Sequence, residues 1–442
     1  MRKLLQSVAV LALAAVAAAS MWFYVSGILR AHQLADAEGK QIPRGNLSDL
    51  YPRWVGTREL LLHHHNPYSR EVTLEIQEGY YGRRLDPARP NDPKDQQGFA
   101  YPVYVVFLLA PLAAVPFPVL LIVFYWLLAL LTAVSVWLWL RALRWPLPLP
   151  AIAACIVLTL GSFPAVQGIK LQQLSLLVGA LLAAAVAGVA SGFLFCGGAL
   201  LALATVKPQL AWPLVVWLLA WAASDWQARR RFVLGFGLVM GLLLAGAEIV
   251  LPGWWRMFAE AVRRYHEYTQ NQSVLEVILN QVLGPFASAG VGRMGGQILA
   301  GIAVLACGPP LWRLRGERAN ASGFGGATAL VLALTVLVVP MYAPYNQLLL
   351  LPAILLLVRD RAAFLLRPPV RRLAYWAGAF VLGWQWIASL CLTAIYLLES
   401  RASAVDGWKW PLFATFALPV WVFALILFHV KDQTRRMHDH RL

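Results

Sequence analysis

An acidic and a basic side chain, Asp49 and Arg53, stand four residues apart shortly after the first apolar run of the chain. Residues at this spacing share one face of a helix, so the guanidinium is expected to keep the carboxylate ionised near neutral pH. Leu50, Trp54 and Leu61 would form an apolar stripe on the same short helix. A carboxylate fixed where this apolar stripe meets water is suited to remove a proton from a hydroxyl group. The alternative is an acidic residue near a helix N-terminus that only complements the helix dipole.

A lysine, Lys207, interrupts the apolar run from Leu200 to Trp221, and Pro208 follows it directly. A lysine in such a run costs several kcal/mol unless it faces a cavity or an anion. If the proline breaks the helix near a membrane surface, the cation and the freed backbone groups would suit a phosphate group. The alternative is a lysine that extends its side chain to water. Lys170, at the preceding turn, is a second candidate for the same contact.

A second polar stretch, residues 252–294, contains Arg264 and His266 among tyrosines and other charged residues. This mixture is suited to hydrogen bonding and stacking with a sugar or a phosphate, but it also fits an amphipathic surface helix.

Three consecutive histidines, His63 to His65, raise the question of a metal site. Consecutive helical residues point about 100° apart, so we expect these histidines on a solvated face rather than around one ion. No metal ligands are therefore assigned.

The amino-acid composition indicates what kind of fold holds these residues in place. Of 442 residues, 60% are hydrophobic and only 13% are charged, and the mean hydropathy is +0.63. A soluble chain would carry about 25% charged residues. The formal net charge of +16 does not indicate nucleic-acid binding, because the basic residues cluster between apolar runs instead of forming one stripe. The sequence therefore predicts an all-α, polytopic membrane protein.

The apolar runs predict about twelve transmembrane helices in a single domain over residues 1–442. They lie near residues 4–28, 118–140, 151–166, 171–190, 193–206, 209–223, 232–251, 295–312, 324–340, 345–358, 373–397 and 411–430. The first run is longer than the core of a signal peptide, about 7–15 residues, so we expect it to be retained as a helix. The four cysteines show no spacing typical of disulfides or zinc ligands.

Short loops rich in Lys and Arg favour the cytoplasm, which orients the chain. Their alternation predicts two cytoplasmic termini in the cytoplasmic (inner) membrane, with residues 29–100 and 252–294 outside. The apolar segment from Tyr101 to Phe117 contains three prolines and would reverse this alternation if it crossed the membrane. We therefore expect it to form interfacial or re-entrant helices, which extends the first extracytoplasmic loop to residues 29–117.

Several short motifs surround these candidate residues. They are Tyr51-Pro52, Trp54 to Gly56, Asn66-Pro67-Tyr68, Phe99-Ala100-Tyr101-Pro102, Ala110-Pro111-Leu112, Gln172 or Gln173 with Ser175, and Val206-Lys207-Pro208. With Asp49 just after the first apolar run, they resemble the GT-C superfamily of membrane glycosyltransferases, and most closely glycosyltransferase family 87. Val103 stands where the family has a second proline, and the segment from Pro340 to Asn346 lacks the histidines associated with its mannosyltransferases. The identity of the sugar therefore stays open.

The resemblance implies a GT-C-like bundle with interfacial helices in the first outer loop. It also implies an inverting enzyme that moves a single sugar, mannose or another monosaccharide, from a polyprenyl-phosphate carrier to an extracytoplasmic lipid or glycan acceptor. No cofactor is expected, and Asp49 would be the general base. The candidates for donor-phosphate binding are Lys207, Lys170, Arg53 and Arg264, and those for substrate binding are Tyr51, Trp54, Tyr101, Gln173, His266 and Asn346.

Two other classes of protein stay open. A multi-span transporter or lipid-linked-sugar flippase would share the many spans and the buried cations, but it should show two related halves, and the sequence shows none. A polysaccharide polymerase or ligase would also have a large outer loop. The sequence contains neither an Asp-x-Asp pair nor a glycine-rich phosphate loop, which argues against a nucleotide-sugar enzyme with a bound divalent metal.

Overall fold

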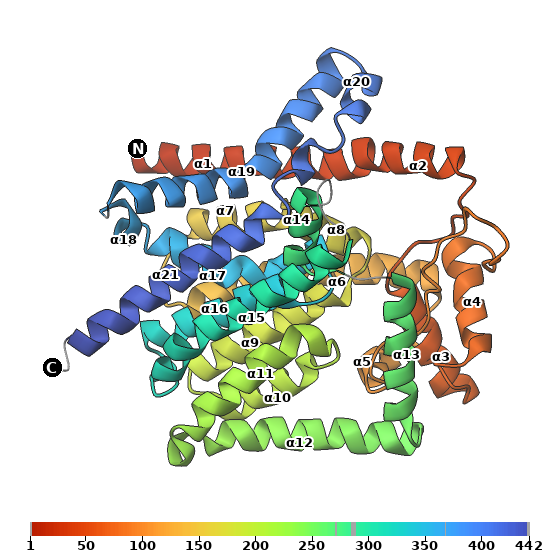
Figure 1. Cartoon of the computed structure of the whole chain (residues 1–442), viewed down its shortest axis with the longest axis horizontal. Coiled ribbons are helices and arrows are strands. Elements are labelled where there is room, and N and C mark those ends of the chain that lie inside the picture. Colours follow the sequence, from red (N-terminus) through yellow and green to blue (C-terminus); the bar gives the residue numbers. More distant parts are fainter. Residues whose placement is uncertain (1, 270–271, 284–288, 367, 440–442) are drawn as a thin grey trace.

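The computed structural model describes residues 2–269, 272–283, 289–366 and 368–439, and every regular element within these ranges is helical (Figure 1). The elements up to Val250 are α1 (Arg2–Phe23), η1 (Tyr24–Leu29), α2 (Arg30–Gly39), α3 (Tyr51–His63), α4 (Arg70–Tyr81), α5 (Val105–Leu109), η2 (Ala110–Leu112), α6 (Phe117–Ala142), α7 (Leu149–Leu160), α8 (Phe163–Lys170), α9 (Leu174–Ala190), α10 (Leu194–Ala204), α11 (Pro208–Ala223) and α12 (Trp226–Val250). The later elements are α13 (Trp254–Thr269), α14 (Val274–Leu283), α15 (Ala289–Leu314), α16 (Ser322–Val338), η3 (Pro344–Leu350), α17 (Leu351–Arg359), α18 (Ala362–Leu365), α19 (Pro369–Leu398), α20 (Arg401–Asp406), η4 (Trp410–Leu412) and α21 (Ala417–Asp439).

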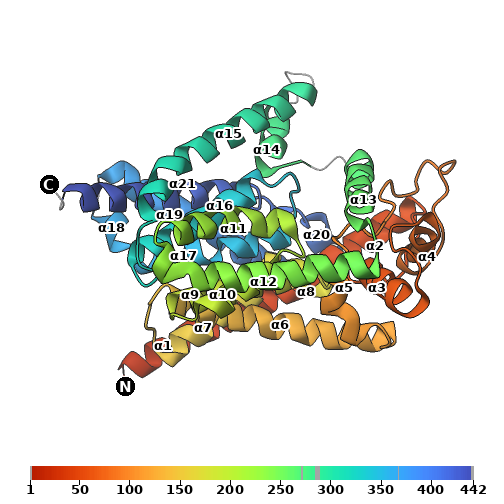
Figure 2. The ribbon, with the colours of Figure 1, turned by 90° about the horizontal axis from the view of Figure 1, so that it is seen from below.

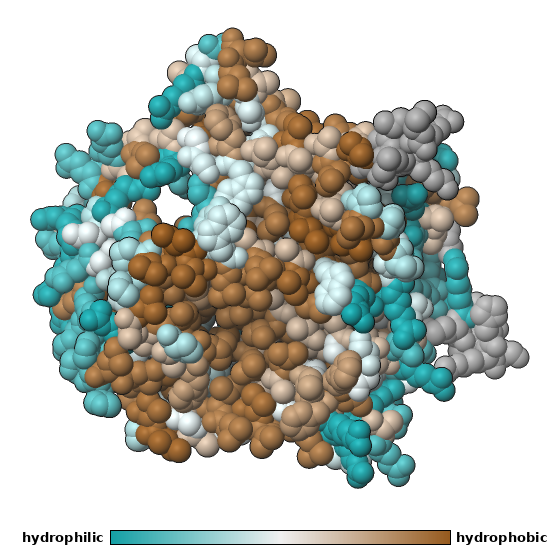
Figure 3. All heavy atoms as spheres, turned by 180° about the vertical axis from the view of Figure 1, so that it is seen from behind, coloured by the Kyte–Doolittle hydropathy of each residue, from teal (hydrophilic) through white to brown (hydrophobic). Residues whose placement is uncertain are grey.

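Within the described residues, six helices are long and apolar enough to cross a membrane. They are Val8–Gly39, Phe117–Ala142, Trp226–Val250, Gly290–Leu314, Pro369–Leu398 and Arg401–Arg436. The count is seven if the pair α7 and α8, bent by 60°, forms one span. Figure 3 shows hydrophobic residues over the middle of one face and hydrophilic residues gathered at its two sides. The chain is therefore a multi-pass helical membrane protein, while the count of about twelve spans stays a prediction that would require the five shorter apolar helices as well.

The shorter apolar helices form the inside of the bundle. α16 is the clearest case, because every residue from Gly323 to Leu337 is buried. α9 buries 11 of its 17 residues, and α11 buries 8 of its 16. A helix that is apolar on all sides is buried in protein or faces lipid, so these segments show no amphipathic pattern in the sequence. The longer helices, including α6, α12, α15 and α19, keep many large apolar side chains exposed to the surroundings.

Three helices close one end of the bundle. Figures 1 and 2 show α3, α4 and α13 at the end opposite both termini, with α13 running across the ends of the long helices. α13 follows α12 after a short turn at Gly253, which has a left-handed backbone (φ 71°). This end carries the first and second outer loops of the sequence analysis, although residues 270–271 and 284–288 of the second loop lie outside the described residues.

One local boundary differs from the sequence expectations, and one expected pair of short helices is present. The first helix does not end near residue 28, since α1, η1 and α2 run without a break to Gly39. The segment from Tyr101 to Phe117 forms two short helices, α5 and η2, and each is too short to cross a membrane. Their position at a membrane interface stays a prediction.

The helices α10 and α12 approach closely because both carry glycine at the contact. A Cβ atom at Gly198 would fall on the backbone of Phe232, and one at Gly235 would fall on the backbone of Phe195. Small residues that let helix backbones approach are a common basis of packing in membranes. A second glycine of α12, Gly237, has nothing within 4 Å of its Cβ position.

Gly235→Ala should therefore destabilise the protein, while Gly237→Ala, two residues away on the same helix, should not. The first substitution forces the helices apart, for which overpacking costs of about 1–3 kcal/mol are typical. The second adds a better helix former at an open position. Thermal unfolding of both variants in one detergent measures the difference. Equal melting temperatures for the two variants would contradict the close α10–α12 contact.

Candidate active site

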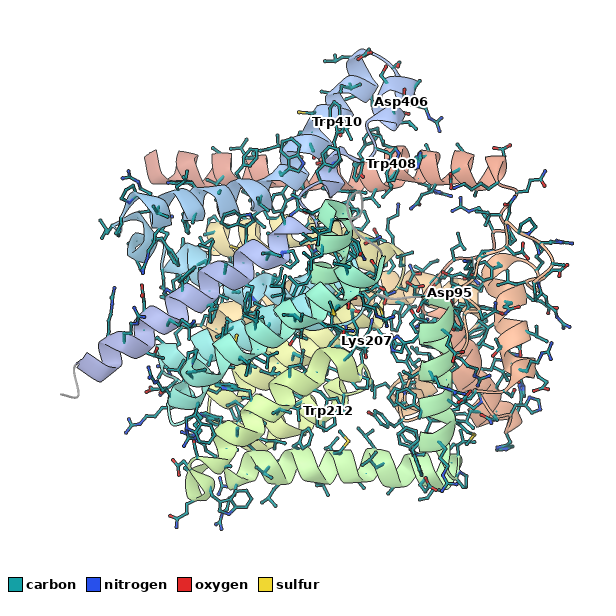
Figure 4. All side chains as sticks on the ribbon, viewed as in Figure 1. Asp95, Lys207, Trp212, Asp406, Trp408 and Trp410 are labelled. Atoms are coloured by element: carbon teal, nitrogen blue, oxygen red, sulfur yellow. The ribbon has the colours of Figure 1, made fainter. Side chains whose placement is uncertain are left out.

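A cavity of about 630 Å³ lies at the end of the bundle that α13 crosses. It is bordered by the residues before α3, the loop before α5, the turn between α8 and α9, the break between α10 and α11, α13, and residues 339–345. Figure 4 labels two of its lining residues, Asp95 and Lys207, on the side of the bundle toward α13. Its polar lining includes Asp49, Arg53, Tyr80, Asp95, Tyr101, Gln173, Lys207 and His266.

Asp49 is held in this cavity by both its backbone and its side chain. Its backbone N–H donates to the carbonyl of Leu171 at 2.9 Å, which ties the start of α3 to the turn between α8 and α9. Its carboxylate accepts hydrogen bonds from the Gln173 amide and from the Tyr80 hydroxyl, the latter at 3.4 Å. Ser48, which could cap a helix, is not the N-cap, because α3 begins after Leu50 without a side-chain cap.

The interaction between Asp49 and Arg53 differs from the sequence expectation. Arg53 Nη1 donates to the backbone carbonyl of Asp49 at 2.7 Å rather than to its carboxylate. Burial raises the pKa of Asp49 above its ordinary value, although Arg53 and the Gln173 amide act in the opposite direction. The spacing of the two residues correctly indicated proximity, but it gave no information on how deeply the carboxylate is buried.

Lys207 occupies the break between α10 and α11 and is only 3% exposed. Its ammonium group donates to Ser175 Oγ at 2.6 Å and to Gln173 Oε1 at 3.5 Å. It also lies 5.2 Å from the centre of the Tyr345 ring. Among the described residues, no carboxylate forms an ion pair with it within 4 Å. A buried cation that has only neutral hydrogen-bond partners is well suited to receive an anionic ligand.

The side chain of Gln173 connects the acidic and the basic group. Its Nε2 donates to Asp49, and its Oε1 accepts from Lys207. Gln172 makes this placement possible, because it adopts a left-handed backbone (φ 50°) and its own amide donates to the carbonyls of Ile169 and Lys170. The turn thus directs Gln173 between α3 and the α10–α11 break.

Arg53 supplies a second cation to the cavity. Its guanidinium lies 4.6 Å from the centre of the Tyr101 ring. Its Nε is buried without a hydrogen-bond partner among the described residues. These two cations and the Asp49 carboxylate therefore border the same space, an arrangement that can bind a phosphate next to a proton acceptor.

Three other residues predicted from the sequence line this cavity, support one of its residues or line a neighbouring cavity. His266 lines it from α13 and is exposed. Asn346 does not line it, but its Oδ1 accepts from Ser175 Oγ at 2.9 Å, so it supports the partner of Lys207. Arg264 lines a neighbouring cavity of about 470 Å³, and its Nε lies 3.7 Å from Glu260.

Three further candidates lie outside both cavities. Lys170 donates to Ser26 Oγ at 2.8 Å. Tyr51 and Trp54 pack against Phe117, with ring centres 4.7 and 5.2 Å apart. Trp54 also donates from its indole N–H to the carbonyl of Leu112 at 3.2 Å. In this structure Tyr51 and Trp54 position α3 against α6 and η2.

The cavity lining also includes three residues that the sequence did not indicate: Asp95, Tyr80 and Tyr345. Asp95 is held by Gln97, whose backbone N–H and amide each donate to its carboxylate at 2.9 Å. Burial raises the pKa of this second carboxyl group. The only signal for it in the sequence is its position four residues before Phe99-Ala100-Tyr101-Pro102. A carboxylate at this place can accept hydrogen bonds from sugar hydroxyl groups.

A further cavity of about 600 Å³ is lined by residues within 359–374 and 425–436 and contains none of these candidates. Its Asp360 carboxylate is already paired, with Arg359 at 2.7 Å and His429 at 3.0 Å. This arrangement indicates a structural ion-pair network and no free reactive group.

The sequence model of glycosyltransferase family 87 matches residues 99–340 of this chain. The matched region is slightly more than half of the sequence and includes Tyr101, Gln173 and Lys207. Asp49 precedes it and Asn346 follows it. No curated protein and no solved structure matches the chain.

Proposed function

Because the chain belongs to glycosyltransferase family 87, we propose that it transfers a single sugar from a polyprenyl-phosphate carrier to a hydroxyl group of an extracytoplasmic lipid or glycan, with inversion at the anomeric carbon. The observation that carries this proposal is the connection of Asp49 and Lys207 through Gln173 in one cavity. It brings a proton acceptor and a buried cation to the same space, as a transfer from a phosphate donor requires.

The proposed step uses these groups in defined roles. Asp49 removes the proton of the acceptor hydroxyl, whose oxygen forms a bond to the anomeric carbon. The bond from that carbon to the carrier phosphate breaks, and the phosphate leaves with both electrons. Lys207 and Arg53 stabilise the charge on the leaving phosphate. No covalent enzyme intermediate is needed, and the product carrier is polyprenyl phosphate.

The lining of the cavity supports a lipid-borne donor. Beside its charged residues it contains Val206, Phe258, Val262, Val339 and Met341, which are suited to an isoprenoid chain. A nucleotide-sugar donor would instead require polar contacts to its base and ribose. Its diphosphate would also place two phosphate groups beside the cations, whereas polyprenyl phosphate places one. The sugar itself, mannose or another monosaccharide, is set by residues that face its hydroxyls, for which Asp95, Tyr101 and His266 are the candidates.

The acceptor would enter through the neighbouring cavity. This cavity shares Gly98 and Ala100 with the first one. It is lined by charged and polar residues, among them Arg70, Arg264 and Glu267. In this arrangement Arg264 contacts the acceptor, whereas Lys207 and Arg53 contact the donor phosphate.

The proposed topology places the active site outside the cytoplasm, in the cytoplasmic membrane. Figures 1 and 2 show both termini at the end of the bundle opposite α3, α4 and α13. The basic clusters of the short loops favour the cytoplasm for the end that carries the termini. A carrier lipid would then present its sugar at the cavity from the outer leaflet.

A donor assay tests the proposal. Protein in lipid nanodiscs is given radiolabelled sugars, mannose included, on polyprenyl phosphate or on nucleoside diphosphates, together with membrane lipid acceptors. We expect transfer of one sugar from the polyprenyl-phosphate donor only. Direct transfer from nucleotide sugars would contradict the proposed donor, and chains of several sugars would favour a polymerase. In a parallel assay with the protein in sealed vesicles, movement of the labelled lipid between leaflets without transfer would favour a transporter or flippase.

A further inference from the structure

The end of α3 brings three potential metal ligands together away from the cavity. The helix ends at His63, and the next residue, His64, caps it with a left-handed backbone (φ 60°). The backbone N–H groups of His64 and His65 both donate to the carbonyl of Glu59. This reversal of the chain places the side chains of His63 and His65 on the two sides of the Glu59 carboxylate. The three histidines are exposed, as expected, but the assumption that they continue one helix with diverging side chains is wrong.

The geometry of this group is compact. The Nδ1 atoms of His63 and His65 each lie 2.8 Å from a different oxygen of Glu59. All three ligand atoms lie within 4.8 Å of one another. The Glu59 side chain is only 7% exposed, whereas those of His63 and His65 are 43% and 66% exposed. The carboxylate is thus fixed by the fold, and the two imidazoles can adjust around an ion that arrives from water.

We infer that Glu59, His63 and His65 form a zinc-binding site on the outer surface of the protein. Imidazole nitrogens and carboxylate oxygens are preferred Zn²⁺ ligands, at about 2.0–2.2 Å, and a fourth position is filled by water. Small rotations of the exposed imidazoles bring their Nδ1 atoms to the ion. The protons now shared with Glu59 move through solvent to Nε2, so that both imidazoles bind in the neutral form.

The site lies outside both cavities, so it takes no part in sugar transfer. Its structural effect follows from its position between α3 and the turn before α4. An ion there would link the last turn of α3 to the chain that leads into α4 and would stabilise the first outer loop. The inference is independent of the proposed function.

Zinc binding by the full chain tests this inference. The protein is purified in detergent without a polyhistidine tag, stripped of metal and titrated with Zn²⁺ while bound ion and melting temperature are measured. We expect one bound Zn²⁺ and a higher melting temperature. His63→Gln and His65→Gln should each weaken binding by about tenfold or more, because each removes one of three protein ligands. His64→Asn is the matched control, since asparagine tolerates the left-handed backbone and residue 64 is not part of the ligand group.

Two results would overturn the inference. One is the absence of stoichiometric Zn²⁺ binding to the unchanged protein. The other is equal binding by His64→Asn and the His63→Gln/His65→Gln double variant. Asp49→Asn separates this site from the proposed function, because it should bind Zn²⁺ as the unchanged protein does.

Discussion

Asp49→Asn is expected to lower the rate of sugar transfer by about 10²- to 10⁴-fold, the usual contribution of a general base. Asparagine has nearly the same size. With its amide oxygen in the position of the Asp49 Oδ2 it still accepts from Gln173, and its NH2 group then faces the Tyr80 hydroxyl, whose oxygen can accept a hydrogen bond. It cannot take the proton of the acceptor hydroxyl. Donor binding and thermal stability should therefore stay close to those of the unchanged protein while turnover is lost. The measurement is the rate of single-sugar transfer in nanodiscs at saturating donor.

The pH dependence of the rate provides a second readout of Asp49. Burial raises the pKa of its carboxyl group above the ordinary value of 3.8, and the base must be ionised to act. The rate should therefore be high above the raised pKa and fall as the pH drops through it, at a higher pH than for an exposed aspartate. Asp36→Asn, at an exposed ion pair with Lys40, is the matched control and should keep both rate and pH profile. An Asp49→Asn variant within a few-fold of the normal rate would refute its role as base.

Lys207→Met is expected to lower kcat/KM by about 10²- to 10³-fold, the loss typical when one group that stabilises developing charge is removed. Methionine fills a similar volume, so the break between α10 and α11 should keep its packing. Removing a buried charge should not reduce stability, because the desolvation of the ammonium is also removed. Loss of activity without loss of melting temperature would separate a role in phosphate binding from a structural one.

Lys40→Met is the control for this substitution, since it removes an exposed lysine from the Asp36 pair. It should leave the transfer rate unchanged. Lys207→Arg should recover part of the activity, because the charge is restored with a different shape. If Lys207→Met kept both its donor KM and its kcat, the phosphate would have to bind elsewhere, and Arg53 would be the remaining cation of the cavity.

The sequence predicted the class of fold from composition, since a chain with this hydropathy can bury its backbone polar groups only as helices or closed barrels in a membrane. It also predicted the break at Lys207-Pro208, because proline has no backbone N–H to donate within a helix and its ring clashes with the preceding turn. The number of spans was harder to predict. Helices such as α10, with 11 residues, are too short to cross a membrane alone, and hydropathy does not distinguish a buried helix from a spanning one.

The site was predicted only in part. Asp49, Arg53, Tyr101, Gln173, Lys207 and His266 do line one cavity. Lys170, Tyr51 and Trp54 are near them in the sequence but point elsewhere, because side-chain direction depends on the packing of α3 and α8. Asp95 lies in a long loop without periodicity, so no pattern indicates where it folds. The histidines are exposed as predicted, but the direction of their side chains was not, since a single left-handed residue at His64 changes the direction of the chain.

The shared hydrogen bonds of Gln173 suggest an order of events. Its amide is oriented by two partners at once, with its nitrogen toward Asp49 and its oxygen toward Lys207. A donor phosphate that attracts Lys207 would leave the amide oxygen without its cation, and the amide would then hold the carboxylate less firmly. The base would become free to meet an incoming hydroxyl only after the carrier has docked. Such sequential loading would activate an acceptor hydroxyl only when a sugar is present to receive it.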